Sequence, residues 1–201
     1  MPESAEEIYA RVVAQVGPEG HLPAPSYTEW DIFPWETPVV PKVLQPPLEH
    51  EEPRAGEAGR PCSCESGDPE HAIWRNDRWT VASLGKPTGM PLVVMLQTRE
   101  HLDFDELDDD LAGEFGRVSS WLHRIITRMD HVGRVHVSKI GDGGAHLHVW
   151  FMARPARFPQ VLGSTVVEWD DILPPGPEDV WRADLRHVAE RLALHDGVAL
   201  V

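Results

Sequence analysis

A segment dense in proline divides this 201-residue chain into two unequal parts. Prolines recur from Gly17 to Pro61, and each removes a backbone N–H donor and fixes its own φ angle, so neither a central strand nor a long helix can run through the segment. The segment also carries Tyr27, Trp30 and Trp35, which a purely disordered linker rarely contains. We expect residues 1–61 to form an extended arm laid over the folded body or a second subunit, with a partly mobile tail as the alternative and a short helix over residues 5–16.

Regular structure is expected after the arm. Apolar runs predict strands over residues 73–74, 79–84, 91–97, 134–140 and 145–153, the last two joined by a glycine-rich turn. Apolar residues recurring at spacings of three and four from Leu107 to Met129 predict a long helix, which Asp103 and Glu106 can cap. Pro177 opens a last helix. These elements are followed by a C-terminal extension with a helix in residues 156–201.

Charge and hydropathy exclude several classes of protein. The net charge is −15 and the basic residues are scattered, which argues against binding to nucleic-acid backbone or to an anionic membrane. No apolar run approaches the roughly 20 residues that cross a bilayer, and the acidic N-terminal sequence has no apolar signal core, so we expect a cytoplasmic protein. Cys62 and Cys64 are the only cysteines, and their spacing strains a disulfide and suits shared coordination of a metal better.

Two histidines are the strongest chemical signal. Because side chains alternate along a strand, His146, His148 and Trp150 are expected on one face, with the two imidazoles roughly 6.6 Å apart. The turn that precedes them contains Gly143 and Gly144, whose backbone N–H groups could hold an anion. An imidazole near neutral pH can act as nucleophile or proton donor. The plainer alternative is a pair of half-exposed histidines without a chemical role.

Residues 143–155, GGAHLHVWFMARP, resemble the signature strand of the histidine-triad (HIT) superfamily, in which His-φ-His-φ-His is followed by apolar residues and often an arginine. IWRNDRWTV resembles the family's first hairpin, and PLVVMLQTREHLDFDEL resembles its strand that ends in a histidine before an acidic helix start. The resemblance spans about residues 62–155 and implies an α+β fold there, an antiparallel sheet with one long helix packed on it. It implies that the middle histidine, His148, attacks the α-phosphorus of a nucleotide and forms a nucleotidyl-histidine, which is then hydrolysed or transferred.

The resemblance also implies a structural zinc ion. Some branches of the superfamily, including the galactose-1-phosphate uridylyltransferases, join a Cys-x-x-Cys pair to the histidine after the third strand and to the first histidine of the signature. The matching residues here are Cys62, Cys64, His101 and His146, with a cysteine spacing one residue shorter. Two thiolates and two imidazoles would close a tetrahedral site and leave His148 free. His50 or His71 could replace a ligand, and two unliganded cysteines are the alternative.

Departures from the family pattern concern substrate recognition. Trp150 replaces the third histidine, and VASLGKP has no counterpart of the acidic residue that binds ribose in many members. We expect Gly143, Gly144, Trp150 and Arg154 to bind substrate, a nucleotide or sugar phosphate, and we favour an enzyme, a phosphoryl or nucleotidyl hydrolase or transferase. The alternative is a non-catalytic, zinc-stabilised protein that binds a ligand or partner. By analogy with HIT dimers the chain could form a homodimer, or the arm could cover that surface and keep a monomer.

Overall fold

The computed structural model describes residues 46–201 together with residues 10, 13, 14, 16, 20, 21, 35, 38 and 39. The aromatic residues Tyr27 and Trp30 of the predicted arm, and most of the predicted helix over residues 5–16, lie outside the described residues. Contacts divide the chain into two units, Met1–Glu52 and Pro53–Val201. None of the described helices is both long and apolar enough to cross a membrane.

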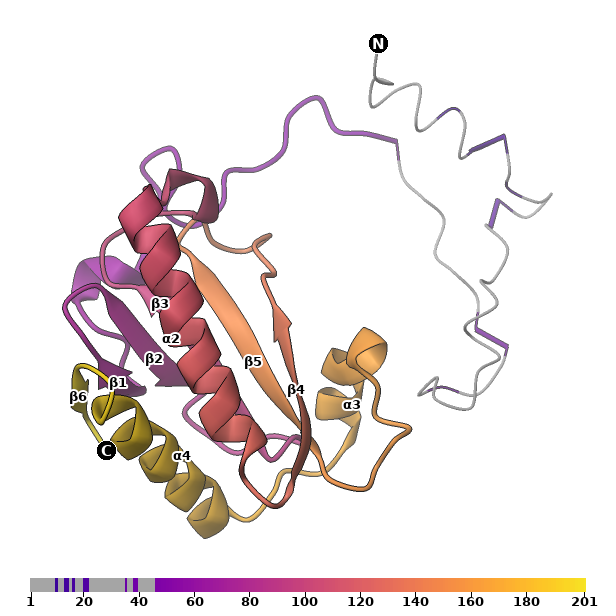
Figure 1. Ribbon diagram of the computed structural model, residues 1–201. Helices are drawn as coiled ribbons and strands as arrows, with labels where there is room; N and C mark the ends of the chain where they lie inside the picture. The colour runs from indigo at the N-terminus through magenta and orange to yellow at the C-terminus, as the bar shows by residue number, and fades with distance from the viewer. Residues whose placement is uncertain are drawn as a thin grey trace. The chain divides into compact units, whose positions relative to one another are not determined.

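The second unit is built on a six-stranded antiparallel sheet with the strand order β4-β5-β3-β2-β1-β6 (Figure 1). The strands are β1 (Ala72–Arg75), β2 (Trp79–Ser83), β3 (Leu92–Thr98), β4 (Val132–Ser138), β5 (His148–Pro155) and β6 (Val198–Ala199). The helices are α2 (Asp109–Thr127), α3 (Val166–Ile172) and α4 (Glu178–Ala193), with the short 3-10 helices η2 (Ser63–Ser66), η3 (Phe104–Glu106) and η4 (Gly163–Thr165). The predicted α+β fold, a long helix on an antiparallel sheet followed by a C-terminal helix, is confirmed.

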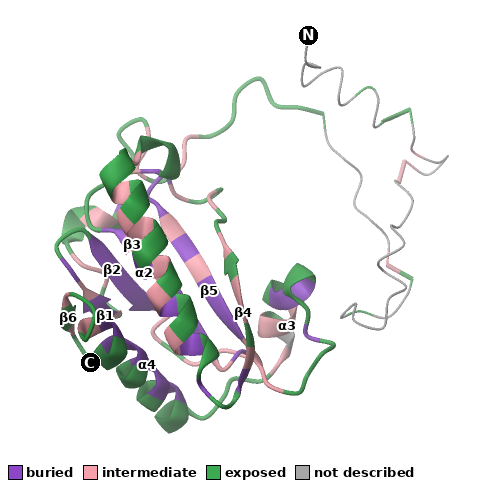
Figure 2. Ribbon diagram, viewed as in Figure 1, coloured by how far each residue is buried: buried purple, intermediate pink, exposed green. Residues whose placement is uncertain are grey.

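Two helices bury apolar stripes against one face of the sheet. Val118, Leu122 and Ile126 of α2 are buried, and α4 contributes the stripe that includes Leu185 and Val188, so the outward sides of both helices stay exposed (Figure 2). Alternate residues of β3 and β5 meet these helices, because side chains along a strand point to opposite faces in turn. This larger core leaves the other face of the sheet for different partners.

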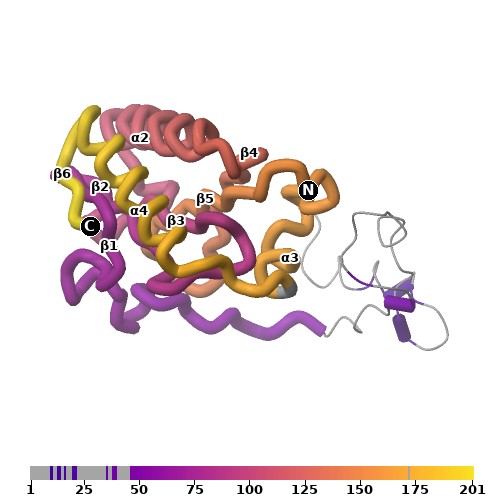
Figure 3. The backbone as a smooth tube through the Cα atoms, turned by 90° about the horizontal axis from the view of Figure 1, so that it is seen from below, coloured from indigo at the N-terminus to yellow at the C-terminus, as the bar shows by residue number. Residues whose placement is uncertain are grey.

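The opposite face, called here the outer face, is partly covered by α3 (Figure 3). Val93 of β3 and Met152 of β5 pack there against Val161 and Val166. Helix α3 was not predicted, because a helix of seven residues is too short to display a helical period. The outer face is the one that carries His148 and Trp150, so α3 limits how much of it ligands can reach.

Element boundaries differ from the predicted ones in two instructive places. Strand β5 begins at His148, so His146 lies in the preceding loop and is not a strand neighbour of His148 as predicted. The Asp103–Glu106 capping box is present but caps η3, whereas α2 starts later with Asp108 as its N-cap.

Candidate functional site

Four side chains from three separate segments meet where the chain enters β5. They are Cys62 and Cys64 at the start of η2, His101 just after β3, and His146 just before β5, and their ligand atoms all lie within 4.8 Å of one another. Cys62 Sγ is 3.4 Å from His146 Nδ1, and Cys64 Sγ is 3.5 Å from His101 Nδ1. The grouping matches the set of ligands expected from the sequence.

These separations suit a tetrahedral metal site. Zinc–sulfur bonds of about 2.3 Å and zinc–nitrogen bonds of about 2.0 to 2.1 Å require a sulfur–nitrogen separation of about 3.6 Å across one tetrahedral edge. The two sulfur–nitrogen distances, 3.4 Å for Cys62–His146 and 3.5 Å for Cys64–His101, are close to that value. Cys64 N–H also donates to Cys62 Sγ at 3.5 Å, a contact that stabilises a thiolate. The donor set of two sulfurs and two nitrogens is one that zinc prefers.

Hydrogen bonding orients His146 toward the cysteines. Its Nε2 lies 2.6 Å from the carbonyl oxygen of Thr98, which can only accept, so Nε2 carries the proton and the lone pair of Nδ1 faces Cys62. Burial lowers the pKa of His146, which favours the neutral imidazole that a metal needs. Burial, followed by the neighbouring Cys62, raises the pKa of the Cys64 thiol to about 11, so a bound cation would have to displace its proton.

Neither alternative ligand belongs to the cluster. His71 packs against Gly85. A Cβ atom added at that glycine would lie only 2.3 Å from His71 Nε2. His50 is highly exposed and lies 4.0 Å from Glu49. Among the described residues, the group capable of holding a metal contains Cys62 and Cys64 with His101 and His146.

The segment before the cysteines is fastened to the site by charge and by backbone pairing. Asp103 accepts from Arg54 at 2.9 Å and pairs with Lys139 at 3.1 Å, which ties three segments together. Burial alone would raise the pKa of Asp103, but the Phe104 amide and the two bases outweigh it and lower the pKa. Ala55 N–H donates to the Gly143 carbonyl, and Ala145 N–H donates back to the Ala55 carbonyl.

His148 is positioned by a hydrogen bond of its own. Its Nδ1 lies 2.8 Å from the carbonyl oxygen of His146, so Nδ1 donates and Nε2 keeps its lone pair. No partner for Nε2 is present in the part of the chain that the structure describes. The ring is partly exposed at the start of β5. An imidazole held in this tautomer can act as a nucleophile or as a base through Nε2.

Polar side chains form a row beside His148. Strand register pairs Gln97 of β3 with His148, and Thr80 of β2 with Gln97, so the three side chains share the outer face. Thr80 and Gln97 line a pocket of about 160 Å³ that extends to Cys64, His146 and Asp68. The pocket therefore lies over β2 and β3 beside the four-residue cluster, and His148 is next to its lining residue Gln97 across the β3–β5 pairing.

Asp68 gives this pocket a negative group held by two arginines. It accepts from Arg75 and, at 3.0 Å, from Arg99. Burial would raise the pKa of Asp68, but the hydrogen bonds from Arg75 and Arg99 more than offset this and lower the pKa. The sequence analysis missed Asp68, Thr80 and Gln97, because only the register of β2 and β3 brings them together. The Asp68-Pro69 pair ahead of the first strand is typical of a turn, which was the one sequence signal near any of these three residues.

The residues expected to bind substrate are not all near one another. The ring of Trp150 lies 6.4 Å from that of His148. Trp150 packs against the cluster that includes Val166 of α3, and its buried Nε1 has no hydrogen-bond partner among the residues that the structure describes. Gly143 lies in the loop before β5 that pairs with Ala55.

Arg154 lies far from His148. Six residues along β5 separate them, roughly 20 Å, and Nη1 of Arg154 donates to the Phe158 carbonyl at 3.0 Å.

Comparisons with known proteins give similarity of fold only. No family model matches the sequence, and no curated protein matches it. A zinc-bound histidine triad family protein from Mycobacterium smegmatis is 13% identical, with a TM-score of 0.47 over 66% of this chain and 93% of that chain. A HIT-like protein involved in cell-cycle regulation from Bartonella henselae is 8% identical, with a TM-score of 0.47 over 64% and 90%. A histidine triad protein from Marinobacter aquaeolei VT8 is 18% identical, with a TM-score of 0.44 over 61% and 91%. Similarity at these levels does not extend to function.

Proposed function

We propose that this chain is a HIT-like nucleotide-processing enzyme, a hydrolase or transferase that acts at a nucleotide phosphate through a nucleotidyl-histidine on His148. The observation that carries the proposal is the 2.8 Å hydrogen bond from His148 Nδ1 to the His146 carbonyl. It fixes the tautomer in which Nε2 has a free lone pair, the form that nucleophilic attack requires.

The reaction proceeds in two displacements. His148 Nε2 forms a bond to phosphorus while the bond from phosphorus to the leaving oxygen or nitrogen breaks; the leaving atom takes the electron pair, and a leaving nitrogen also takes a proton from solvent. The imidazole becomes cationic, and the His146 carbonyl that accepts from Nδ1 stabilises the new positive charge. Water or another acceptor then attacks phosphorus, loses a proton, and returns the electron pair to Nε2.

Residues beside His148 are proposed to hold the substrate. Thr80 and Gln97 line the neighbouring pocket and can bond sugar or phosphate oxygens. The N–H groups of Gly143 and Gly144 are proposed to contact phosphate, and the face of Trp150 to contact a base or sugar. Arg154 is too distant from His148 to share a small phosphate with it.

Cys62, Cys64, His101 and His146 are proposed to hold a structural zinc ion. The fit rests on the sulfur–nitrogen separations of 3.4 and 3.5 Å and on the orientation of His146 Nδ1. When bound, zinc would fasten η2 to the ends of β3 and β5, and no coordination position would be left for substrate.

A non-catalytic binding protein is the second candidate, and Trp150 is the observation that favours it. Trp150 stands at the position of the third histidine and packs against the apolar cluster beneath α3. A side chain so placed can hold a ligand while excluding the water that hydrolysis needs. This function predicts saturable nucleotide binding without product.

Turnover and metal content test the two functions together. Wild type, His148→Ala and His123→Ala are compared for hydrolysis of nucleotide phosphoramidates and for zinc content; His123 is an exposed histidine on α2. The enzyme proposal expects turnover to fall at least about 100-fold in His148→Ala alone, because the nucleophile is lost. Unchanged turnover in that variant overturns the proposal, and binding without product in wild type supports the binding protein.

Zinc is tested by metal analysis of the purified protein and of Cys62→Ser, with Ser63→Ala as control. One zinc ion per chain is expected in wild type and in the control, with loss in Cys62→Ser because a hydroxyl is a poor zinc ligand. Equal metal content in all three proteins would show that these residues hold no zinc.

A further inference from the structure

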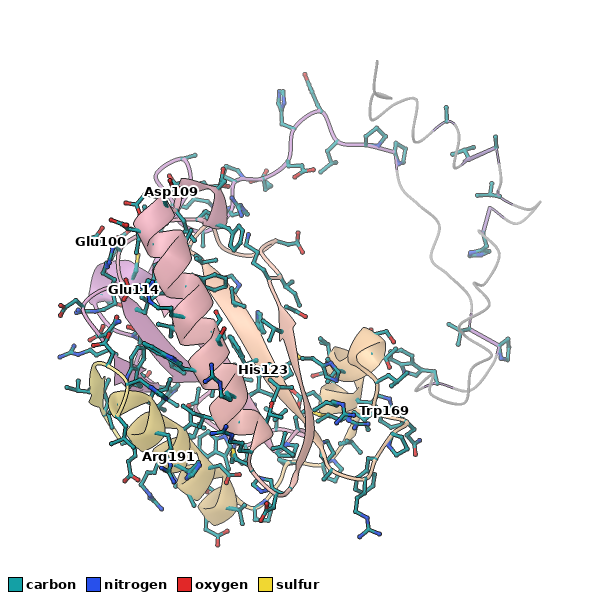
Figure 4. The ribbon with its side chains drawn as sticks, viewed as in Figure 1. Glu100, Asp109, Glu114, His123, Trp169 and Arg191 are labelled. Atoms are coloured by element: carbon teal, nitrogen blue, oxygen red, sulfur yellow. The ribbon has the colours of Figure 1, made fainter. Side chains whose placement is uncertain are left out.

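A groove on the opposite side of the molecule from the outer face separates α2 from α4. It has a volume of about 410 Å³ and is lined by Ile125, Arg128, His187, Arg191, Leu194 and His195. Figure 4 labels Arg191 on α4. Trp121 of α2 stacks on His195, which follows the end of α4, and the lining residues come from α2, from α4 and from the residues directly after each helix. No residue of the proposed nucleotide site takes part.

The lining is basic although the chain as a whole is acidic. Four of the six lining residues are arginine or histidine and none is a carboxylate, in a chain of net charge −15. Arg128 and Arg191 make no side-chain hydrogen bond or ion pair with any residue that the structure describes. By contrast, Arg182 on the same helix as Arg191 pairs with Glu178 at 2.6 Å. Two free guanidinium groups in one hollow form an electrostatic site for an anion.

The shape of the groove favours a ligand with an apolar part. Its apolar lining residues are Ile125, which is partly buried, and Leu194, which is 75% exposed. The His195 ring is stacked on Trp121 with centroids 4.8 Å apart and an angle of 7°, which holds it in a fixed orientation. The volume lies within the range of small-molecule sites, roughly 300 to 1,000 Å³.

Helix dipoles explain only part of this arrangement. A basic residue in the last turn of a helix interacts favourably with the carbonyl end, which accounts for Arg191 in α4 and for Arg128 directly after α2. The dipoles do not account for His187 or for the hollow between the helices. If Arg128 and Arg191 only stabilise the ends of the two helices, replacing them leaves the affinity for an anion unchanged. If they bind a ligand, replacing them lowers that affinity.

We propose that the groove between α2 and α4 binds a small organic phosphate, with the phosphoryl group between Arg128 and Arg191 and the organic part on Ile125 and Leu194. Two permanent charges and two histidines match a dianion better than the single charge of a carboxylate. The site is independent of His148 and of the four-residue metal cluster.

The test measures binding of phenyl phosphate and inorganic phosphate to the full chain by calorimetry, with amide chemical shifts to locate the site. The double variant Arg128→Gln/Arg191→Gln is compared with Arg124→Gln on α2 and Arg182→Gln on α4, which remove arginines outside the groove. We expect phenyl phosphate to bind more tightly than inorganic phosphate, affinity to fall at least about tenfold in the double variant alone, and shifts to centre on residues 125–128 and 187–195.

Three outcomes overturn the proposal. They are absence of saturable binding at millimolar ligand, equal affinity in the folded double variant, and shifts confined to the surroundings of His148. Thermal unfolding of each variant shows whether it is folded, and the single variants Arg128→Gln and Arg191→Gln replace the double variant if that protein does not fold.

Discussion

At the scale of single residues, Gly56 shows how a backbone position supports the metal cluster. Its φ angle is +91°, and a Cβ there would lie 2.4 Å from Cε1 of His101. Gly59 has a similar φ of +78° but no heavy atom within 4 Å of the same position. Any side chain at either glycine is strained, whereas only a side chain at Gly56 would push His101 out of place.

This pair of glycines gives a matched prediction. Gly59→Ala is expected to lower the free energy of unfolding by about 1 kcal/mol and to keep the affinity for zinc. Gly56→Ala is expected to cost more and to weaken zinc binding at least about tenfold, because His101 must move. Chelator competition and urea unfolding measure both effects, and equal zinc affinity in the two variants would contradict the role given to Gly56.

Asp68 predicts how stability depends on pH. Its pKa is lowered from the ordinary 3.8 in the folded chain, so the folded state holds the carboxylate to lower pH than the unfolded state does. The stabilisation is complete above the unfolded pKa and is lost as the pH falls through the folded pKa. Asp68→Asn should therefore be less stable than wild type at neutral pH and should approach it below about pH 4. Urea unfolding at several pH values checks this, with exposed Asp77→Asn as control; a constant difference between wild type and Asp68→Asn would contradict it.

At the scale of elements, hydrophobic period predicted most of the second unit. The five longer strands and both longer helices appear where apolar residues repeat with periods of two or 3.6. Strand β6 was missed because two residues carry no period, and its place is set by pairing of Val198 and Ala199 with β1. The start of β5 was placed three residues early, since the apolar alternation continues through residues 145–147 while hydrogen bonds divert that backbone to Ala55 and Leu102.

The packing of α2 against the sheet depends on its buried apolar residues. Leu122 of α2 is fully buried in the larger core, whereas Leu194 after α4 is 75% exposed. Leu122→Ala should lower the free energy of unfolding by about 2 to 5 kcal/mol, because the cavity it leaves adds to the lost burial. Leu194→Ala should change it by less than about 0.5 kcal/mol. Denaturant unfolding compares the two, and similar losses would show that α2 does not depend on this packing.

At the scale of the whole molecule, the question is where the folding unit begins. The sequence predicted a boundary at residue 62 because prolines end there. The compact unit begins at Pro53, and residues 53–61 contribute the Arg54–Asp103 ion pair and the Ala55 backbone bonds. Proline density does not reveal such contacts, since a proline-rich segment can pair at single positions while forming no strand.

Truncation tests this boundary. A fragment of residues 53–201 is expected to unfold cooperatively and to keep the zinc content of the full chain. A fragment of residues 62–201 should be less stable and bind zinc more weakly, since Asp103 loses Arg54 and His101 loses its contact with Gly56. Thermal unfolding and metal analysis compare the fragments, and equal behaviour would support the predicted boundary at residue 62.

The site itself could be predicted only in part. Cys62, Cys64, His101 and His146 were grouped by resemblance, and the structure brings them together. The neighbouring pocket depends on which strands pair and in what register, which composition and period leave open.

The hydrogen bonds of His146 run in two directions and join two parts of the molecule. Its side chain donates to Thr98 at the end of β3, and its carbonyl accepts from His148. Under the proposed function, a change in the position of the cysteines would move His146 and, through its carbonyl, His148. The expected result is a slower reaction with unchanged substrate affinity. The proposed metal site and the proposed nucleophile are therefore coupled through His146 alone, by its ring on one side and its carbonyl on the other.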